Sequence, residues 1–213
     1  MAADVAHAQV SGSVGVVSDY RYRGSSLSAG DPALQASVAW DGASGAYAGL
    51  FASGVRHGGS GDTLWIPYAG YARRDRQGRS WDIGVRYSHF ADAEYFDYPE
   101  LHAGVSFRHV ALRVHYAHAY FGGASSGYVG IDGDVPLAER LRLLLHAGAA
   151  RALDGGGDGA RADARIGLSW TSRACDVSIA WHIVGGGGDP DPYYAPWNRG
   201  DRQGWVLGCV HRW

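Results

Sequence analysis

Residues 81–90 read WDIGVRYSHF, and this stretch decides the fold class. Apolar Trp81, Ile83 and Val85 occupy the odd positions, while polar or small residues occupy most of the even ones. An apolar residue at every second position indicates a β-strand with one apolar face. The stretch is about ten residues long, which is the length of a tilted strand that crosses a membrane. It therefore predicts one wall strand of a transmembrane barrel.

The same alternation recurs along the chain, most clearly at residues 163–170 and 175–183, and helical periodicity is nearly absent. We therefore predict an all-β fold, a transmembrane antiparallel up-and-down β-barrel of about twelve strands, an even number as such barrels require. The strands are expected near residues 9–23, 32–41, 45–56, 63–73, 79–90, 99–108, 110–121, 126–135, 139–151, 161–171, 174–184 and 203–213.

The composition agrees with this fold. The 213 residues include 33 Gly, 8 Trp and 13 Tyr, which favours sheet and tight turns. No run of 18 apolar residues is present, so no transmembrane helix is expected. The formal net charge of −2 argues against a nucleic-acid partner, because nucleic-acid binders carry a strongly basic surface.

The connections between the expected strands alternate in length. Short ones such as DGAS at 41–44 follow the even strands, and longer or glycine-rich ones such as 185–202 follow the odd strands. Outer-membrane barrels have short periplasmic turns, longer external loops and both termini in the periplasm. The pattern therefore predicts a bacterial (Gram-negative) outer-membrane location, with outer-membrane lipid and lipopolysaccharide as surroundings.

Aromatic residues lie at both ends of the expected strands. Trp205 and Trp213 are eight residues apart on one face of the last strand, about 20 Å along the barrel axis, close to the height of an apolar band. Tyr20 and Tyr22 are expected on the lipid side of the first strand. A soluble sandwich or lipocalin-like barrel would also alternate, but its aromatic residues would lie mid-strand and its polar face would carry mostly charge.

Residues 1–8 end in Ala6-His7-Ala8, the small-x-small pattern of a signal-peptidase site. We interpret residues 1–8 as left over from a signal peptide or from cloning, and residues 9–213 as the barrel. Cys175 and Cys209 are too few for a disulfide framework and lack the spacing of a zinc site. Both are expected on the lipid face as free thiols, since a disulfide would need a shift in register.

Several stretches resemble one known family. The most specific is Ser18-Asp19-Tyr20 with Arg23-Gly24 inside VVSDYRYRGSSLSAGDPALQASVAW, and similar barrel-like segments lie at 45–55, 98–122 and 128–151. These residues resemble the TorF family of proteobacterial outer-membrane proteins. The resemblance implies a signal peptide, an outer-membrane location and a porin-like role. The Arg- and Ala-rich composition and residues 185–202 look particular to this chain, so the resemblance carries no solute preference.

If Trp213 faces lipid, the opposite face of every strand lines the lumen. A watery lumen tolerates charges that lipid would not, particularly where opposite charges pair. These side chains either brace the wall or form a constriction that sorts solutes by charge. The predicted pore-lining residues are Asp19, Arg21, Arg23, Asp82, Arg86, Glu100, His102, Arg113, His115, Asp132, Arg142, His146, Asp163, Arg165, Asp176 and His182.

His102 and His115 form the most notable pair in this set. If Arg108-His109 is a two-residue turn, the two histidines lie directly opposite each other, with Cβ atoms about 5 Å apart. Two imidazoles at that distance could hold a divalent metal or titrate together. No third ligand is evident in the sequence, so we expect a solvated polar pair and neither a metal nor a cofactor.

The sequence favours a porin-like channel for passive passage of ions or small polar solutes, as a monomer or small homo-oligomer. One alternative is a closed structural or adhesive barrel that uses Tyr193, Tyr194 and Trp197 for contact. Another is an outer-membrane enzyme that acts on lipids. The enzyme is disfavoured because no nucleophile elbow or metalloprotease helix is present, and no serine in a nucleophile context stands beside His118.

Overall fold

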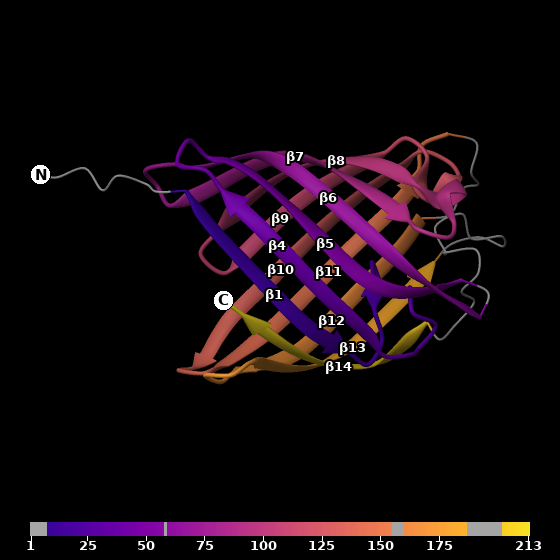
Figure 1. Cartoon of the computed structure of the whole chain (residues 1–213). Coiled ribbons are helices and arrows are strands. Elements are labelled where there is room, and N and C mark those ends of the chain that lie inside the picture. Colours follow the sequence, from indigo (N-terminus) through magenta and orange to yellow (C-terminus); the bar gives the residue numbers. More distant parts are fainter. Residues whose placement is uncertain (1–7, 58, 155–159, 187–201) are drawn as a thin grey trace, which may run out of the picture.

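The structure is a computed structural model that describes residues 8–57, 59–154, 160–186 and 202–213. Twelve antiparallel strands form a closed barrel in which each strand pairs with its neighbours in the chain (Figure 1). The predicted up-and-down barrel is therefore confirmed. Among the described residues, no helix is long and apolar enough to cross a membrane.

The wall strands are β1 (Gln9–Val17), β4 (Ala33–Asp41), β5 (Ala46–His57), β6 (Ser60–Arg74), β7 (Arg79–Phe90), β8 (Tyr98–Phe107), β9 (Val110–Ala117), β10 (Ser126–Ala138), β11 (Leu141–Ala152), β12 (Ala160–Thr171), β13 (Asp176–Gly186) and β14 (Gln203–Arg212). Four shorter elements lie in the connections: β2 (Arg21–Tyr22), β3 (Ser25–Ser26) and the 3₁₀ turns η1 (Glu94–Phe96) and η2 (Tyr120–Gly122).

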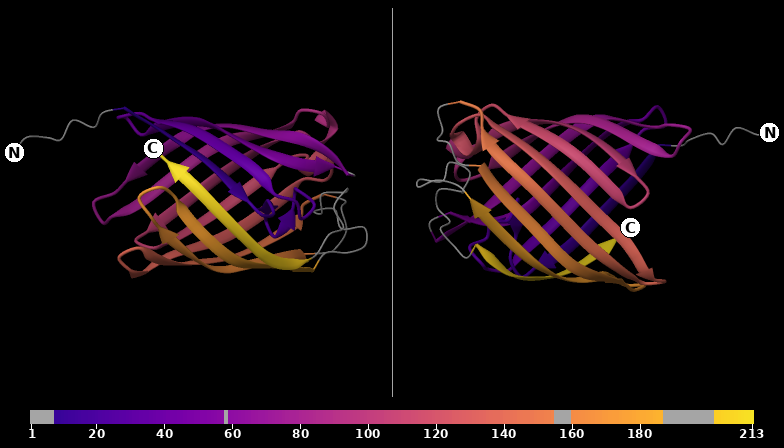
Figure 2. Two further views of the ribbon diagram at one scale, coloured as in Figure 1. Left: turned by 60° about the horizontal axis from the view of Figure 1, so that its bottom comes forward. Right: turned by 180° about the vertical axis from the view of Figure 1, so that it is seen from behind.

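The two ends of the barrel differ. Short turns join the strands at one end, which also holds the first residues of β1 and the last residues of β14; we call it the turn end (Figure 2). The opposite end, here called the loop end, carries the other connections, including β2, β3, η1 and η2. Most loop-end connections are longer than the turns, as the sequence predicts. The β5–β6 connection is an exception: a longer glycine-rich loop is expected there, but β6 begins three residues after β5 ends.

The outer wall is apolar and the inner wall is polar or small. On β7, for example, Trp81 and Ile83 are 51% and 64% exposed on the outer surface, while Arg86 points into the lumen. Trp213 is likewise exposed on the outside. An apolar exterior around a charged interior is the reverse of a soluble barrel, and it matches a wall that faces lipid.

The first wall strand is shorter than predicted. A single strand over 9–23 is expected from the sequence, but β1 ends at Val17 and the chain then turns into the barrel. Residues 18–32 hold the short hairpin β2–β3 inside the loop end. Tyr20 and Tyr22 consequently line the interior cavity, so their predicted lipid-facing position is wrong.

The β2–β3 hairpin turns on Arg23 and Gly24, which have φ angles of 49° and 78°. Two successive residues with positive φ form the tight turn that suits a two-residue hairpin. For a residue with a side chain, this conformation costs about 1 kcal/mol. Arg23 is therefore held there by its contacts, which are described below.

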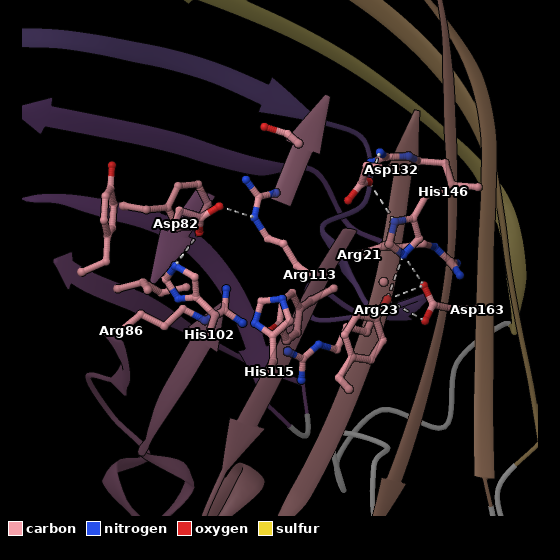
Figure 3. A pocket seen from close by; sticks show the side chains of 18 of the residues that line it. Arg21, Arg23, Asp82, Arg86, His102, Arg113, His115, Asp132, His146 and Asp163 are labelled. Carbon is pink, nitrogen blue, oxygen red and sulfur yellow. Dashed lines mark hydrogen bonds and ion pairs between the residues drawn. The ribbon is translucent and has the colours of Figure 1, made fainter. Parts of the chain in front are cut away.

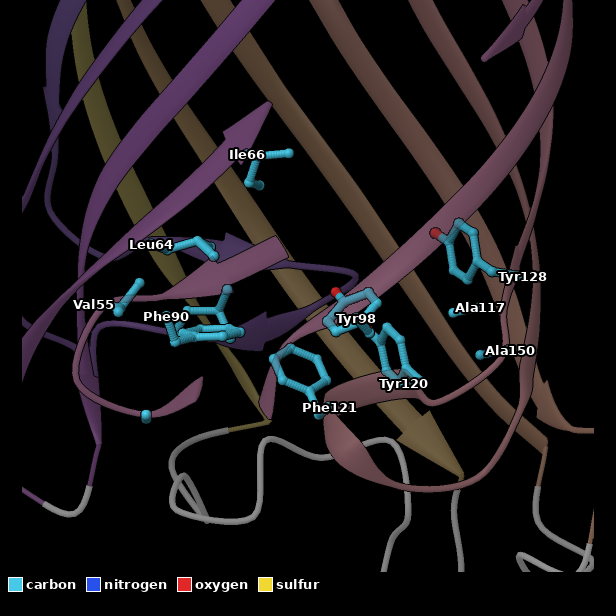
Figure 4. Packing of buried hydrophobic residues seen from close by; sticks show 12 residues of the cluster. Val55, Leu64, Ile66, Phe90, Tyr98, Ala117, Tyr120, Phe121, Tyr128 and Ala150 are labelled. Carbon is cyan, nitrogen blue, oxygen red and sulfur yellow. The ribbon is translucent and has the colours of Figure 1, made fainter. Parts of the chain in front are cut away.

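Apolar side chains fill part of the lumen at the loop end (Figure 4). Leu27 from the inserted segment, Phe90, Tyr98 and the η2 residues Tyr120 and Phe121 are each less than 10% exposed. Phe90 and Phe121 lie with ring centroids 5.7 Å apart. This cluster is the hydrophobic core of the molecule. It lies inside the barrel, because the apolar side chains of the outer face point away from the barrel, toward lipid.

Inward-facing tyrosines lie flat over inward-facing glycines. A Cβ atom added to Gly148 would sit 1.9 Å from the hydroxyl of Tyr128, and one added to Gly70 would sit 2.3 Å from the hydroxyl of Tyr47. A glycine lets a neighbouring ring lie against the sheet where any side chain would push it away. The glycines thus keep these rings close to the wall and leave space in the lumen.

The barrel closes where the two ends of the chain meet. β1 and β14 share five paired positions, from Ser13 opposite Arg212 to Val17 opposite Gly208. Gly12 and Trp213 add two reciprocal backbone hydrogen bonds, each 3.1 Å long. The final tryptophan therefore takes part in closing the wall.

The charged cavity of the barrel

A cavity of about 750 Å³ occupies the lumen (Figure 3). It reaches the turn end at Ala72, Ser80 and Ser106, and it is bounded toward the loop end by the inserted residues Tyr20 to Gly24. The charged and histidine side chains that line it are Arg21, Arg23, Asp82, Arg86, His102, Arg113, His115, Asp132, His146, Asp163, Arg165 and His182. All of these residues belong to the set predicted from the sequence.

The densest group of ion pairs fixes the inserted hairpin to the wall. Glu100 on β8 is fully buried, and its carboxylate accepts a hydrogen bond from the Arg23 guanidinium at 2.7 Å. Arg86 on β7 pairs with the same carboxylate, and His115 Nδ1 lies 2.8 Å from it. The Arg23 guanidinium also lies 4.2 Å from the ring centroid of Tyr128. Charge and cation–π contacts therefore both hold the tip of the hairpin.

The far side of the hairpin meets the opposite strands. Arg161 on β12 donates a hydrogen bond to the Ser25 hydroxyl. Gly24 packs so closely against Asp163 and Val184 that an added Cβ would lie within 2.8 Å of both. Since Glu100 is on β8 and Val184 is on β13, residues 23–25 reach across the lumen. We name residues 18–32 the crossing segment.

A second ion-pair group lies on β10, β11 and β12. The two ring nitrogens of His146 lie 2.8 Å from Asp132 and 3.0 Å from Asp163, and the Tyr128 hydroxyl contacts both His146 and Asp163. Arg165 approaches Asp132 at 3.4 Å. The His146 imidazole therefore bridges two carboxylates, and these contacts connect the side chains of β10, β11 and β12.

His102 and His115 lie directly opposite each other across β8 and β9, as the two-residue turn predicts. Their ring centroids are 5.8 Å apart. His102 Nε2 shares a hydrogen bond with the Tyr47 hydroxyl at 3.0 Å, while His115 Nδ1 faces Glu100. Within the described ranges, no three His, Cys, Asp or Glu side chains are placed to hold a metal ion.

Four predicted pore-lining residues are not in the cavity lining. Asp19 and Glu100 are buried behind it as ion-pair partners of Arg21 and Arg23. Arg142 lies at the turn end in an exposed pair with Asp134, and Asp176 pairs there with Arg212. The alternation gives the inward direction of a side chain, but it does not tell how far along the barrel the cavity extends.

The predicted set also omits part of the lining. Tyr47, Phe51, Ile66 and Tyr68 on β5 and β6 line the cavity opposite the charged strands. They occupy inward positions of strands that the sequence does predict. Assigning an inward or outward direction to every residue of these strands, and not only to the charged ones and histidines, would have identified them. Restricting the set to charged and histidine side chains left them out.

Outside the membrane-spanning strands, Ser125 and Asp154 tie two loop-end connections together. The Ser125 hydroxyl and backbone N–H both donate to the Asp154 carboxylate, at 2.6 and 2.7 Å. These hydrogen bonds lower the pKa of Asp154 below its ordinary value. The Ser125 hydroxyl also contacts the backbone oxygen of His118, so the arrangement is a loop tether and not a serine activated by a histidine base.

A closed twelve-strand barrel with an apolar exterior and a charged interior defines the chain as a porin-type transmembrane β-barrel. Residues 2–204 match a family described as "Bacterial protein of unknown function (Gcw_chp)", and the chain belongs to that family. The match does not carry the TorF name, which stays a prediction from resemblance. No curated protein matches the chain.

Solved structures share the fold. The structure described as "KdgM porin" aligns with a TM-score of 0.58 at 11% identity, covering 93% of this chain and 98% of that one. A structure from work titled "Unveiling the Mechanism Behind the in-meso Crystallization of Membrane Proteins" aligns with a TM-score of 0.53 at 9% identity, covering 95% of this chain and 83% of that one. At such identities the likeness establishes the fold alone.

Proposed function

We propose that the protein is an outer-membrane porin-like channel for passive passage of ions or small polar solutes. The observation that carries this proposal is a cavity of about 750 Å³, lined by charged side chains, inside a wall that is apolar outside. Such a lining is costly in a closed apolar interior but suits a hydrated passage. The likeness to a structure named as a porin adds support to this choice.

The outer wall supports a location in a Gram-negative outer membrane. Trp40, Trp81 and Trp170 near the turn end and Trp65 and Trp205 farther toward the loop end are all at least 40% exposed. Aromatic girdles of this kind mark the two lipid–water interfaces of outer-membrane barrels. In this orientation the turn end faces the periplasm and the loop end faces outward. The signal-peptide interpretation of residues 1–8 falls almost wholly outside the described residues, and oligomeric state stays a prediction.

The first expected result concerns the barrel itself. The folded protein should require detergent or lipid, give a β-type circular dichroism spectrum, and migrate differently on a gel before and after boiling, because a closed barrel resists unfolding by detergent. A monodisperse monomer in detergent-free buffer would contradict the membrane location. This experiment tests the location without reference to conduction.

The solute preference should be weakly anionic. The Arg113 side chain is 43% exposed in the cavity and lies 3.8 Å from Asp82, and the Arg165 side chain is 35% exposed. Guanidinium groups stay charged at any working pH, and these two are held more loosely than Arg23. They are therefore available to an anion in the passage, where salt would screen the attraction.

Replacing Arg113 with alanine should shift the reversal potential toward cations and raise the single-channel conductance. The change removes a positive charge and a long side chain from the passage. Planar-bilayer recordings in a salt gradient measure both quantities. Arg142→Ala is the matched control, because Arg142 points inward but lies outside the cavity in an exposed ion pair. Equal behaviour of the two variants would mean that Arg113 only braces the wall.

The apolar cluster at the loop end favours a second candidate, a closed barrel with a structural or adhesive role. Leu27 of the crossing segment packs with Phe90 and Phe121 and fills part of the lumen. The same recordings distinguish the two candidates, since a closed barrel gives no channel events. The enzyme alternative lacks comparable support. The Ser125 hydroxyl donates hydrogen bonds to the Asp154 carboxylate and the His118 backbone oxygen, so no histidine ring activates it as a nucleophile.

A further inference from the structure

We propose that the outer wall of β6–β9 carries a binding site for one anionic phospholipid, located at the turn end. One acyl chain would lie in an apolar groove, and the phosphate would bind arginines of the β6–β7 turn. The proposal goes beyond conduction and rests on the proposed membrane location and orientation. In that orientation the turn end lies in the periplasmic leaflet.

The groove is a depression of about 360 Å³ on the outside of the barrel. Its floor is Ala103, whose small side chain stands opposite Ile83 and Val114 on the neighbouring strands. Trp81 and Leu112 border it toward the turn end. Large apolar side chains around a small one form a trough that an acyl chain can occupy with favourable burial. The groove therefore supplies the apolar half of a lipid site.

The positive half lies at the end of the groove. Arg73 lines the groove and pairs across the strands with Trp81. The adjoining turn adds Arg76, and within the described part of the chain neither Arg73 nor Arg76 forms an ion pair. Arg79 pairs with Asp75, the only acidic residue of the turn. The turn thus presents uncompensated positive charge beside an apolar trough.

Other short turns do not combine these two features. The β4–β5 turn contains no arginine, and the β8–β9, β10–β11 and β12–β13 turns contain one each, Arg108, Arg140 and Arg173, whereas residues 73–79 contain four. Arginine binds phosphate through several N–H donors, and clustered basic residues at a membrane surface favour anionic lipids. The charge and the groove together therefore fit phosphatidylglycerol better than zwitterionic phosphatidylethanolamine or a second copy of the chain.

The test is native mass spectrometry of the full chain refolded in detergent with equimolar phosphatidylglycerol and phosphatidylethanolamine. We expect one phosphatidylglycerol per barrel, retained at least about five-fold over phosphatidylethanolamine. The double variant Arg73→Gln, Arg76→Gln should remove that preference, whereas Arg173→Gln should keep it. Ala103→Leu, which fills the floor, should reduce retention of both lipids, whereas Ala147→Leu at an outward position of β11 should not.

Three results would overturn the proposal. One is equal retention of the two lipids by the unmodified chain. Another is displacement of the bound lipid by millimolar glycerol phosphate, which would indicate a site for a free phosphate group. The third is a dimer that forms without lipid and is lost in Ala103→Leu, which would assign the groove to a second copy. The gel-shift and conductance experiments test location and channel function separately, so their failure would be recognised independently.

Discussion

Replacing Glu100 with glutamine is expected to lower the free energy of unfolding by about 3–5 kcal/mol, the usual loss when one partner of a buried ion pair is removed. Glu100 is 1% exposed, and its carboxylate is shared by Arg23, Arg86 and His115. Glutamine preserves the shape but removes the negative charge, so two guanidiniums remain close together without a counter-charge. Chemical denaturation in detergent micelles, followed by tryptophan fluorescence, measures the change.

Asp134→Asn is the control for this variant. Asp134 also pairs with an arginine, Arg142, but both side chains are more than 40% exposed. Exposed pairs contribute about 0–1 kcal/mol because water already solvates both charges. If Glu100→Gln cost no more than this control, the crossing segment would be held by packing and not by charge.

Removing the hairpin should raise single-channel conductance several-fold. Tyr20 and Leu27 form the base of the hairpin, with the Leu27 N–H donating to the Tyr20 oxygen at 2.7 Å. Replacing residues 21–26 by Asn-Gly keeps this base and removes the part that reaches across the lumen. Because Glu100 also loses Arg23, the selectivity should shift toward cations. Planar-bilayer recordings measure both effects.

A smaller deletion at the turn end provides the comparison. Replacing residues 75–78 by Asn-Gly shortens the β6–β7 turn without touching the crossing segment, and it should leave conductance near that of the unmodified chain. An unchanged conductance after removal of the hairpin would show that the crossing segment does not limit passage. Gel mobility before and after boiling checks that both variants are folded.

The wall of the barrel could be predicted from the sequence because a strand records its two faces in alternate residues. The phase set by Trp213 gives the correct direction for Arg86, His102 and Arg113. The His102–His115 pairing also follows from local turn geometry. Such features depend on residues that are close together in the chain, so they can be predicted from a single sequence.

The crossing segment could not be predicted in the same way. Residues 19–23 also alternate in polarity, and this pattern resembles a continuation of β1. Their position depends on residues that are far away in the sequence. Glu100 on β8 and Arg161 on β12 hold Arg23 and Ser25 inside the lumen. The strand predicted over residues 9–23 has fifteen residues, which is more than a membrane crossing needs. This extra length and the Arg23-Gly24 pair are the only features of the sequence that point to a hairpin here.

The seam between β1 and β14 has a consequence for the order of assembly. Gly12 and Trp213 are far apart in the sequence, yet their backbones form hydrogen bonds to each other. Every other pair of adjacent wall strands is joined by a local connection, whereas this pairing must close a loop that contains all the other wall strands, at the largest entropic cost. The seam should therefore form last during folding. Until it does, both edge strands expose unpaired backbone groups, which can pair with a strand of another chain.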